Sequence, residues 1–325
     1  MVIQVIEEPV LFEETKWQKL RFIPEQPIKL RIHLYGENSS FQAGRDYLYD
    51  EETSRIRRTK NSRIPDWSTH PLYGKESFNH ILYNNYSNQP YTCVVRYTYK
   101  EFEEIEESRG KINKFSLSQL FQKIDNKEKG KYVVFGDSIS AGYEASASDK
   151  AYPFLFWEWI KRQFPKAHLE IVNHAHPGES TRGALQRVEK AVIQEQPDLV
   201  SIAYGMNDQT RQVDGTNAIS IEEFRENIST MIQEIREKTD ADILLFTSCL
   251  PNPRWVYTSE NIEQYAEVIR SFQPMKRITV VDVQKEWQKE LKAGKKIESL
   301  LLNNLNHPND YGHHLYLVAI KKALF

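Results

Sequence analysis

The sequence contains little cysteine and no long apolar segment. Its 325 residues include two cysteines, Cys93 and Cys249, and both fall in apolar stretches that favour strands. We therefore expect buried, unpaired thiols, which suit a reducing cytoplasm. No apolar run approaches the roughly 20 residues of a membrane-spanning helix. The first residues also lack the basic region and the long apolar core of a secretory signal, so we expect a cytoplasmic protein without a membrane partner.

The sequence also lacks an excess of either charge. Its 43 Lys and Arg nearly balance 45 Asp and Glu, and the net charge of −2 gives no indication of a nucleic-acid partner. With 40% hydrophobic residues the chain can bury a sizeable core, and its length suits two domains. Self-association into a homo-oligomer stays open.

Residues 1–125 carry the pattern of short strands. Between 28 and 34, apolar Ile and Leu alternate with Lys, Arg and His, which predicts a half-buried strand. The segment 91–99 is rich in β-forming residues and predicts a second strand. Shorter candidates, separated by turn residues, lie at 46–49, 56–59 and 78–83. This spacing predicts an antiparallel β-sandwich, which would form an accessory domain of residues 1–125.

A charged connector follows the last of these strands. The segment 101–131 begins with a run of glutamates, continues with a stretch that fits one short helix, and ends in further charged residues. Such a change in composition is typical of a domain boundary. We place the boundary between residues 125 and 126.

After residue 131 the pattern changes to alternating strands and helices. Apolar runs lie at 132–135, 169–172, 199–203, 243–247 and 278–281, and apolar residues at helical spacing lie within 184–192, 221–235 and 315–320. This alternation predicts an α/β domain, residues 126–325, with a parallel sheet and helices on both faces. In such a sheet ligands bind beyond the carboxyl ends of the strands. The residues directly after each strand are therefore the candidates for function.

Residues suited to ester hydrolysis follow three of these strands and precede the last helix. Ser138 follows the first strand, Gly178 the second and Asn207 the third, while His307 lies before the final helix. A serine nucleophile needs a neutral imidazole to accept its proton. The backbone N–H groups of Ser138 and Gly178 and the side-chain amide of Asn207 are suitable donors to the oxyanion. The pattern therefore favours acyl transfer through a serine.

Each of these residues also has a purely structural explanation. Ser138 and Asn207 could cap the helix or turn after their strands. Gly178 could relieve a turn, and His307 could pack under Pro308. It is the occurrence of all four after the expected elements, in this order, that favours the catalytic interpretation.

In these segments the sequence resembles the SGNH (GDSL) hydrolase superfamily. The resemblance covers about residues 131–325 and rests on Phe135-Gly136-Asp137-Ser138, Asn173 through Gly178, Gly205-Met206-Asn207-Asp208 and His307-Pro308-Asn309. It implies a flavodoxin-like, doubly wound parallel sheet of about five strands and ester or acetyl hydrolysis without metal or cofactor. It further implies Ser138 as nucleophile, His307 as base, and Ser138, Gly178 and Asn207 as oxyanion donors. With the preceding sandwich, the chain resembles the two-domain carbohydrate esterases of this superfamily.

One position departs from that pattern. The superfamily usually has an aspartate three residues before the histidine, and this chain has Asn304 there. An asparagine can orient the His307 ring but cannot offset the charge of an imidazolium. Three interpretations follow: a backbone carbonyl steers His307, another acid such as Asp310 does so, or the enzyme is slow. We favour the first and expect Asn304 to lie close to His307 as a histidine-orienting residue.

Other polar residues near the strand ends suggest weaker hypotheses. Asp137 and Asp208 each follow a strand next to a helix start, so we interpret them as capping residues. The histidine pairs are ill-placed to form a metal site, because 174 and 176 need further ligands and 313 and 314 lie on different faces of one helix. We predict no metal. Trp255 and Tyr257, in the loop after the fourth strand, either bind substrate or pack within a stiff connector.

The function we predict is that of a serine esterase that removes acetyl or other short acyl groups. The resemblance implies an acetylated carbohydrate as the substrate class, so the partner we expect is a small-molecule or oligosaccharide ester. One alternative is a lipid or thioester acylhydrolase with the same residues, although the sequence shows no insertion rich in Leu and Phe for a long acyl chain. A second alternative is a carbohydrate-binding protein whose hydrolase domain is impaired by Asn304.

Overall fold

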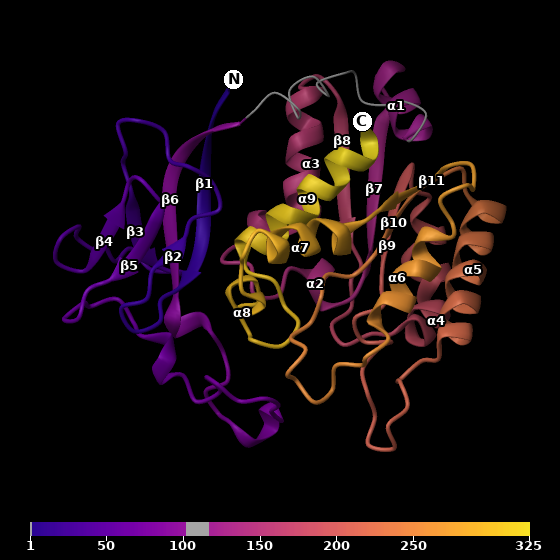
Figure 1. Ribbon diagram of the computed structural model, residues 1–325. Coiled ribbons are helices and arrows are strands. Elements are labelled where there is room, and N and C mark those ends of the chain that lie inside the picture. The colour runs from indigo at the N-terminus through magenta and orange to yellow at the C-terminus, as the bar shows by residue number, and fades with distance from the viewer. Residues whose placement is uncertain (1, 102–116) are drawn as a thin grey trace.

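The computed structural model of this protein describes residues 2–101 and 117–325, which form an N-terminal region of antiparallel sheets and a C-terminal α/β region (Figure 1). Residues 102–116, which hold most of the glutamate run of the predicted connector, lie outside the described residues. In the described part of the chain, none of the helices is long and apolar enough to cross a bilayer.

The α/β region is built on a parallel sheet of five strands, as predicted. The strands are β7 (Lys129–Gly136), β8 (His168–Asn173), β9 (Leu199–Ala203), β10 (Asp242–Phe246) and β11 (Ile278–Val281). Their spatial order is β8-β7-β9-β10-β11, which is the flavodoxin-like order. The strand after β7 is added on one side of it, and the later strands are added on the other side. A ligand crevice is therefore expected beyond the carboxyl ends of β7 and β9, where the strand order changes direction.

Helices cover both faces of this sheet because successive strand residues face opposite sides. Val133 and Phe135 of β7 pack with the helices on one face, and Tyr132 and Val134 pack with those on the other. The first face carries α4 (Thr181–Ala191), α5 (Ile221–Lys238) and α6 (Ile262–Arg270), and the second carries α1 (Ser118–Asp125), α3 (Tyr152–Gln163), α7 (Val283–Lys292) and α9 (Asp310–Leu324). The shorter helices α2 (Ser138–Ala141) and α8 (Ile297–Leu300) lie in loops.

The N-terminal region contains two antiparallel sheets of three strands each. One sheet has the order β1-β6-β3, from Val2–Leu11, Thr92–Glu101 and Arg31–Leu34, and the other has the order β2-β5-β4, from Gln18–Lys19, Arg55–Arg58 and Tyr47–Asp50. Buried Ile32 and Val95 of the first sheet and Ile56 of the second belong to one core. The antiparallel arrangement is confirmed, and β1 and β2 were not predicted.

One predicted strand is wrong. The segment 78–83 forms a short 3₁₀ helix, His80–Leu82, instead of a strand. The Asn79 side chain accepts a hydrogen bond from Ile81 N (3.1 Å) and so caps this helix. Phe78 is the only part of the segment that pairs like a strand, and it does so with Trp255 of the α/β region. The other 3₁₀ helices are Trp67–Thr69, Gln89–Tyr91, Ser148–Lys150 and Ile193–Glu195.

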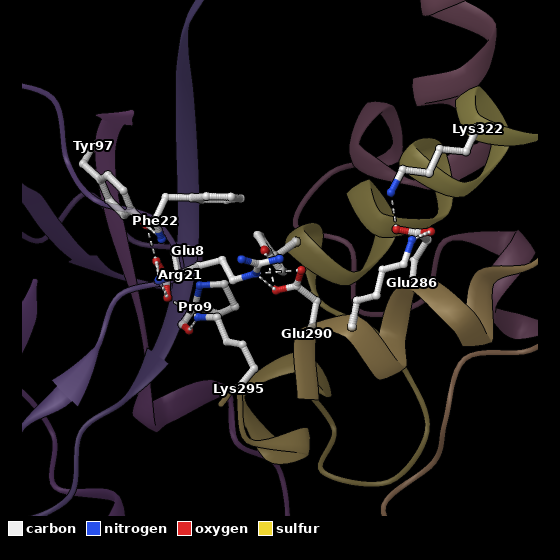
Figure 2. A network of polar contacts seen from close by, with 11 residues as sticks. Glu8, Pro9, Arg21, Phe22, Tyr97, Glu286, Glu290, Lys295 and Lys322 are labelled. Carbon is white, nitrogen blue, oxygen red and sulfur yellow. Dashed lines mark hydrogen bonds and ion pairs between the residues drawn. The ribbon is translucent and has the colours of Figure 1, made fainter. Parts of the chain in front are cut away.

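The two regions are joined by a buried polar network (Figure 2). The Glu8 carboxylate is fully buried and accepts from Tyr97 Oη (2.5 Å), Arg21 N (2.9 Å) and Lys295 Nζ (2.5 Å). The Arg21 guanidinium in turn donates to Glu290 of α7 (3.0 Å). Since Glu8 pairs with Lys295 and Arg21 pairs with Glu290, two ion pairs hold the N-terminal sheets against α7 and the loop after it.

Both cysteines are buried and free, as predicted. Cys93 lies in β6 and Cys249 follows the end of β10. Burial raises the pKa of the Cys249 thiol to about 12, so this side chain behaves as a small apolar group.

Candidate active site

Ser138 lies where β7 gives way to α2. Asp137 caps α2 by accepting a hydrogen bond from Ile139 N (2.9 Å), so the chain turns sharply and Ser138 becomes the first residue of the helix. The turn needs a glycine at position 136, because a Cβ there would lie 2.9 Å from the Ala203 carbonyl oxygen and even closer to Ser140. Ser138 is 5% exposed, and its Oγ lies 2.8 Å from His307 Nε2.

His307 lies in the loop between α8 and α9, which Asn303 holds in shape. The Asn303 side-chain oxygen accepts from the backbone N–H groups of Leu305 (2.9 Å), Asn306 (3.0 Å) and His307 (3.0 Å). The ring of Tyr143, from the segment after α2, packs edge-on against the His307 ring at a centroid distance of 5.6 Å. The histidine is therefore positioned by its backbone and by ring packing.

Among the described residues, Asn304 gives no hydrogen bond that would orient the His307 ring at Nδ1. His307 Nδ1 is buried and has no hydrogen-bond partner among the described residues. Asn304 adopts a left-handed conformation (φ 61°), and its side-chain oxygen accepts from Asn252 Nδ2 at 2.9 Å. Asp310 Oδ1 accepts a hydrogen bond from Tyr35 Oη (2.7 Å), and Asp310 Oδ2 accepts one from Ser146 Oγ (2.6 Å). Neither the neighbouring asparagine nor the nearest acid in sequence takes the place of the usual aspartate at Nδ1, and no backbone carbonyl of residues 2–101 and 117–325 does so either.

The surroundings of His307 favour its neutral form. Burial, together with the charge of His313, lowers the pKa of His307 to about 4. At neutral pH the imidazole is therefore uncharged and able to accept a proton from Ser138. Because no described carboxylate is hydrogen-bonded to Nδ1, an imidazolium at this position would need stabilisation from other groups.

The three candidate oxyanion donors come from neighbouring loops. His176 N donates to Gly136 O (2.8 Å), which ties the loop after β8 to the end of β7. Gly178 adopts φ 76°, with no heavy atom within 4 Å of the place a Cβ would occupy. Asn207 Nδ2 donates to Glu179 O (3.0 Å), directly after Gly178. A primary amide carries two hydrogens, so Asn207 retains one for a ligand.

Asp137 and Asp208 both hold the loops together, which agrees with the capping interpretation. Asp208 accepts from Thr181 N (2.9 Å), Thr181 Oγ1 (2.5 Å) and Gly205 N (3.1 Å), and so joins the start of α4 to the loop after β9. Burial raises the pKa of Asp137 to about 7 and that of Asp208 to about 6. Neither carboxylate has a hydrogen bond to His307.

Trp255 and Tyr257 lie in an aromatic cluster that both regions build. Trp255 Nε1 donates to His80 Nδ1 (3.0 Å), and the His80 ring meets the rings of Tyr86, Trp255 and Tyr257 edge-on. Trp255 is 8% exposed, whereas Tyr257 is half-buried. The part played by His80 and Tyr86 was not predicted from the sequence. The aromatic content of residues 78–86 was the only signal for it.

His174 and His313, one from each histidine pair, have separate structural contacts. His174 Nε2 lies 3.0 Å from Glu195, and His313 is bonded to the backbone of Tyr143 and Tyr152. Within residues 2–101 and 117–325, the structure gathers no group of three side chains able to hold a metal ion.

The fold and the segments around Ser138, Gly178, Asn207 and His307 are those of an acylhydrolase family. Residues 134–315, more than half of the chain, match the GDSL-like Lipase/Acylhydrolase family, and the chain belongs to that family. This confirms the resemblance seen in the sequence. Among similar proteins are the uncharacterized lipoprotein YqeF of Bacillus subtilis (strain 168), 31% identical over 120 residues, and an acetylxylan esterase of Geobacillus stearothermophilus, 24% identical over 169 residues.

These matches cover different shares of each protein. The alignment with YqeF spans 37% of this chain and 48% of that protein, and the alignment with the acetylxylan esterase spans 51% and 76%. Among solved structures, a two-domain esterase (CEX) active on acetylated mannans matches with a TM-score of 0.52 and 22% identity, over 66% of this chain and 53% of that one. The acetylxylan esterase Axe2 from Geobacillus stearothermophilus matches with a TM-score of 0.52 and 23% identity, over 60% and 94%. This chain therefore spans about half the length of YqeF and of CEX, and the likeness to the two structures establishes the fold.

Proposed function

We propose that this protein is a serine esterase that removes acetyl or other short acyl groups from a carbohydrate. The proposal rests on the 2.8 Å contact between Ser138 Oγ and His307 Nε2, in a chain of the GDSL-like family. A nucleophile and a base within hydrogen-bond reach are the minimum that acyl transfer through a serine requires.

The first half of the proposed reaction forms an acyl-serine. Ser138 Oγ attacks the ester carbonyl carbon while His307 Nε2 takes the hydroxyl proton. The oxyanion accepts hydrogen bonds from Ser138 N–H, Gly178 N–H and Asn207 Nδ2, and each such donor lowers the barrier by about 3 kcal/mol in comparable enzymes. The bond from the carbonyl carbon to the sugar oxygen then breaks, and His307 gives its proton to the leaving sugar.

The second half releases the acid. His307 Nε2 takes a proton from a water molecule as the water oxygen attacks the acyl carbon. The same three donors hold the second oxyanion. When the bond to Ser138 Oγ breaks, the proton returns from His307 to the serine, and the free carboxylic acid leaves.

The carbohydrate part of the proposal is supported by the acetylxylan esterase relative and by the aromatic cluster. Aromatic faces commonly offer apolar contact area with a polar edge, which suits sugar rings. We propose Tyr257, held by Trp255 at a centroid distance of 5.7 Å, as the substrate-contacting wall. Trp255 is largely covered and would act chiefly as its support.

A second candidate function is favoured by one observation. His307 Nδ1 has no partner among the described residues, so the Ser138–His307 pair lacks the acid that normally stabilises the imidazolium. A protein that binds carbohydrate without hydrolysing it would show the same feature. The esterase proposal predicts turnover in spite of it.

Covalent labelling and hydrolysis separate these candidates. A fluorophosphonate should label the wild type and fail to label Ser138→Ala, while Ser140→Ala, a buried serine in the same helix, should keep its label. The wild type should also release acetate from acetylated xylooligosaccharides faster than it cleaves long-chain esters. A wild type that is neither labelled nor active on p-nitrophenyl acetate would establish the binding function, and a preference for long acyl chains would establish a lipid acylhydrolase.

We further propose that the two domains divide before α1. This helix lies before residue 126, yet Gln119 N donates to Asp242 of β10 (2.6 Å), and Leu120 and Phe121 pack in the core of the parallel sheet. A fragment of residues 117–325 should therefore resist urea better than a fragment of residues 126–325, because only the first keeps α1. A stable fragment that starts at residue 126 would restore the boundary predicted from composition.

A cytoplasmic location is our proposal from the two free, buried cysteines. One relative carries the word lipoprotein in its name, so the alternative is a membrane-attached protein. Fractionation of source cells with an antibody to the protein tests this, and recovery in the membrane pellet would overturn the proposal.

A further inference from the structure

The loop that carries His307 is anchored on the N-terminal region through Leu302. Leu302 N–H donates to His307 O (3.0 Å), while Leu302 O accepts from Asn88 N (2.8 Å) and Ser87 Oγ (3.0 Å). The Leu302 side chain is 2% exposed and packs with Tyr35 of the N-terminal region. A single residue of the loop is therefore bonded on one side to the histidine and on the other side to the N-terminal region.

Asn88 fixes the start of the same loop with its side chain. It is fully buried, and Nδ2 donates to the carbonyl oxygens of Glu298 (2.9 Å) and Leu301 (3.1 Å), which lie at the end of α8. Its Oδ1 accepts from Trp67 Nε1 (3.0 Å). An indole can only donate and a carbonyl can only accept, so the amide has one orientation in this site. Asn88 thus binds one carbonyl group within α8 and one directly after it, and the Leu301 carbonyl also accepts from Asn304 N (3.1 Å).

Tyr35 fixes the opposite side of the histidine. Its hydroxyl accepts from Asp310 N (3.1 Å) and shares its proton between Asp310 Oδ1 (2.7 Å) and Glu144 O (2.9 Å). Asp310 also accepts from Ser146 N (2.8 Å). The segment from 143 to 146 carries Tyr143, whose ring packs against His307. Tyr35 therefore joins the segment that carries Tyr143, whose ring contacts His307, to the start of α9.

We propose that Asn88 and Tyr35 are positioning residues for His307, so that the N-terminal region does the orienting work that an acidic partner of Nδ1 does in other serine hydrolases. The proposal rests on the esterase function proposed above. An imidazole without a hydrogen bond at Nδ1 is free to rotate unless its backbone and its ring contacts are fixed. Asn303 and Tyr143 supply these contacts within the α/β region, and the N-terminal region holds both in place, the backbone through Leu302 and the segment of Tyr143 through Tyr35.

Asn88→Ala and Tyr35→Phe in the full chain test this proposal on p-nitrophenyl acetate. Since misplacing a catalytic group by about 1 Å can cost a hundredfold in rate, kcat should fall by about 10- to 100-fold. KM should stay within about twofold because neither side chain lies among the proposed oxyanion donors or aromatic contacts. The acid limb of the kcat/KM profile should also move to higher pH. A more mobile His307 ring is better hydrated, and hydration raises its pKa. Partial unfolding alone would lower the amount of active enzyme and leave that limb in place.

Arg21→Gln is the matched control. It breaks a different contact across the same interface, that with Glu290, and Arg21 has no hydrogen bond to the segment 301–307 among the described residues. Its melting temperature should fall while kcat and the acid limb stay as in the wild type. Ser87→Ala serves as a milder variant if Asn88→Ala does not fold, because it removes the Oγ bond to Leu302 O and leaves the Asn88 contacts. Its kcat should fall about fivefold, the value of one hydrogen bond.

Folded Asn88→Ala and Tyr35→Phe proteins with the wild-type kcat and acid limb would overturn the positioning role. Failure of the esterase function is a separate result: the wild type itself would then take no fluorophosphonate label and cleave no acetyl ester. In that case nuclear magnetic resonance of ¹⁵N-labelled histidine decides the positioning role without activity. The His307 ring signals should broaden or split in both variants and stay sharp in Arg21→Gln. Unchanged signals in all three would again overturn it.

Discussion

At the scale of single residues, the two ring nitrogens of His307 have unlike surroundings. Nε2 lies 2.8 Å from Ser138 Oγ, while Nδ1 is buried without a partner among the described residues. Burial disfavours the charged ring, so the proposed base is a weak one that stays neutral over a wide pH range. The pH dependence of the reaction should reflect this directly.

The first prediction concerns that pH dependence. A histidine with its pKa lowered to about 4 remains neutral, and therefore active as a base, as the pH falls below the usual value of 6.5. The acid limb of kcat/KM should thus lie near pH 4 in the free enzyme. Initial rates on p-nitrophenyl acetate between pH 3 and 8, with tryptophan fluorescence to confirm folding at each pH, measure it. An acid limb near pH 6.5 in a folded protein would show that the ring is hydrated.

The second prediction concerns Asn207. Replacing it with alanine removes one proposed oxyanion donor, so kcat should fall by about 10²- to 10³-fold with KM little changed. Steady-state kinetics on the same ester provide the measurement. Glu179 O also loses its partner in this variant, and Asn217→Ala, which removes another side-chain amide from the same connection between β9 and α5, is the control for general loosening. An equal loss in both variants would mean that Asn207 acts only on loop structure.

At the scale of elements, the site depends on how closely the end of β7 approaches its neighbours. Strands β7 and β9 pair in parallel up to Gly136 and Ala203, and the chain then turns at once into α2. Glycine allows this approach because a side chain would meet the backbone of the next strand. The position of Ser138 is therefore set by packing at the strand end as well as by its own contacts.

The third prediction follows from that packing. A Cβ at position 136 would lie 2.8 Å from Ser140 Cβ and 2.9 Å from Ala203 O. Gly136→Ala should destabilise the fold by about 1–3 kcal/mol, the usual cost of overpacking. Urea unfolding measures the loss. The double variant Gly136→Ala with Ser140→Ala should recover only part of it, because the contact with the Ala203 backbone remains. Full recovery would place the whole cost on the Ser140 side chain.

At the scale of the whole molecule, charged residues join two regions that have different folds. Glu8 of β1 has no exposed surface, and its partner Lys295, in the loop after α7, has a side chain that is 8% exposed. Figure 2 shows these residues between the N-terminal strands and the C-terminal helices. Removing one member of such a pair leaves the other charged and buried.

The fourth prediction uses this pair. Lys295→Met should cost about 3–5 kcal/mol of stability, because Glu8 stays buried without its counter-charge. Lys289→Met is the matched control on the neighbouring helix. Its side chain is 44% exposed and pairs with Glu286, so its loss should cost at most about 1 kcal/mol. Thermal and urea unfolding of both variants provide the comparison, and equal losses would show that the Glu8 pair is hydrated in solution.

Local patterns were sufficient to predict the sheet of the α/β region and the contact between Ser138 and His307. The strands at 199–203 and 278–281 have the predicted bounds, because buried parallel strands are continuous apolar runs. The segment 78–83 was predicted wrongly as a strand. Its β-forming residues are outweighed by the cap at Asn79 and by the packing of Phe78 on Trp255, a contact with a residue far along the chain.

The sequence by itself determined the family, the α/β sheet and the pairing of Ser138 with His307, because each depends on short apolar runs and on the residues that end them. The tertiary structure alone decided what surrounds the histidine. The Asn304 side chain is hydrogen-bonded to Asn252, and that of Asp310 is hydrogen-bonded to Tyr35. Asn88 supports the loop that carries His307 through its hydrogen bond to Leu301 O. These partners are distant in sequence, and hydrogen bonds between distant residues leave no periodic pattern from which they could have been predicted.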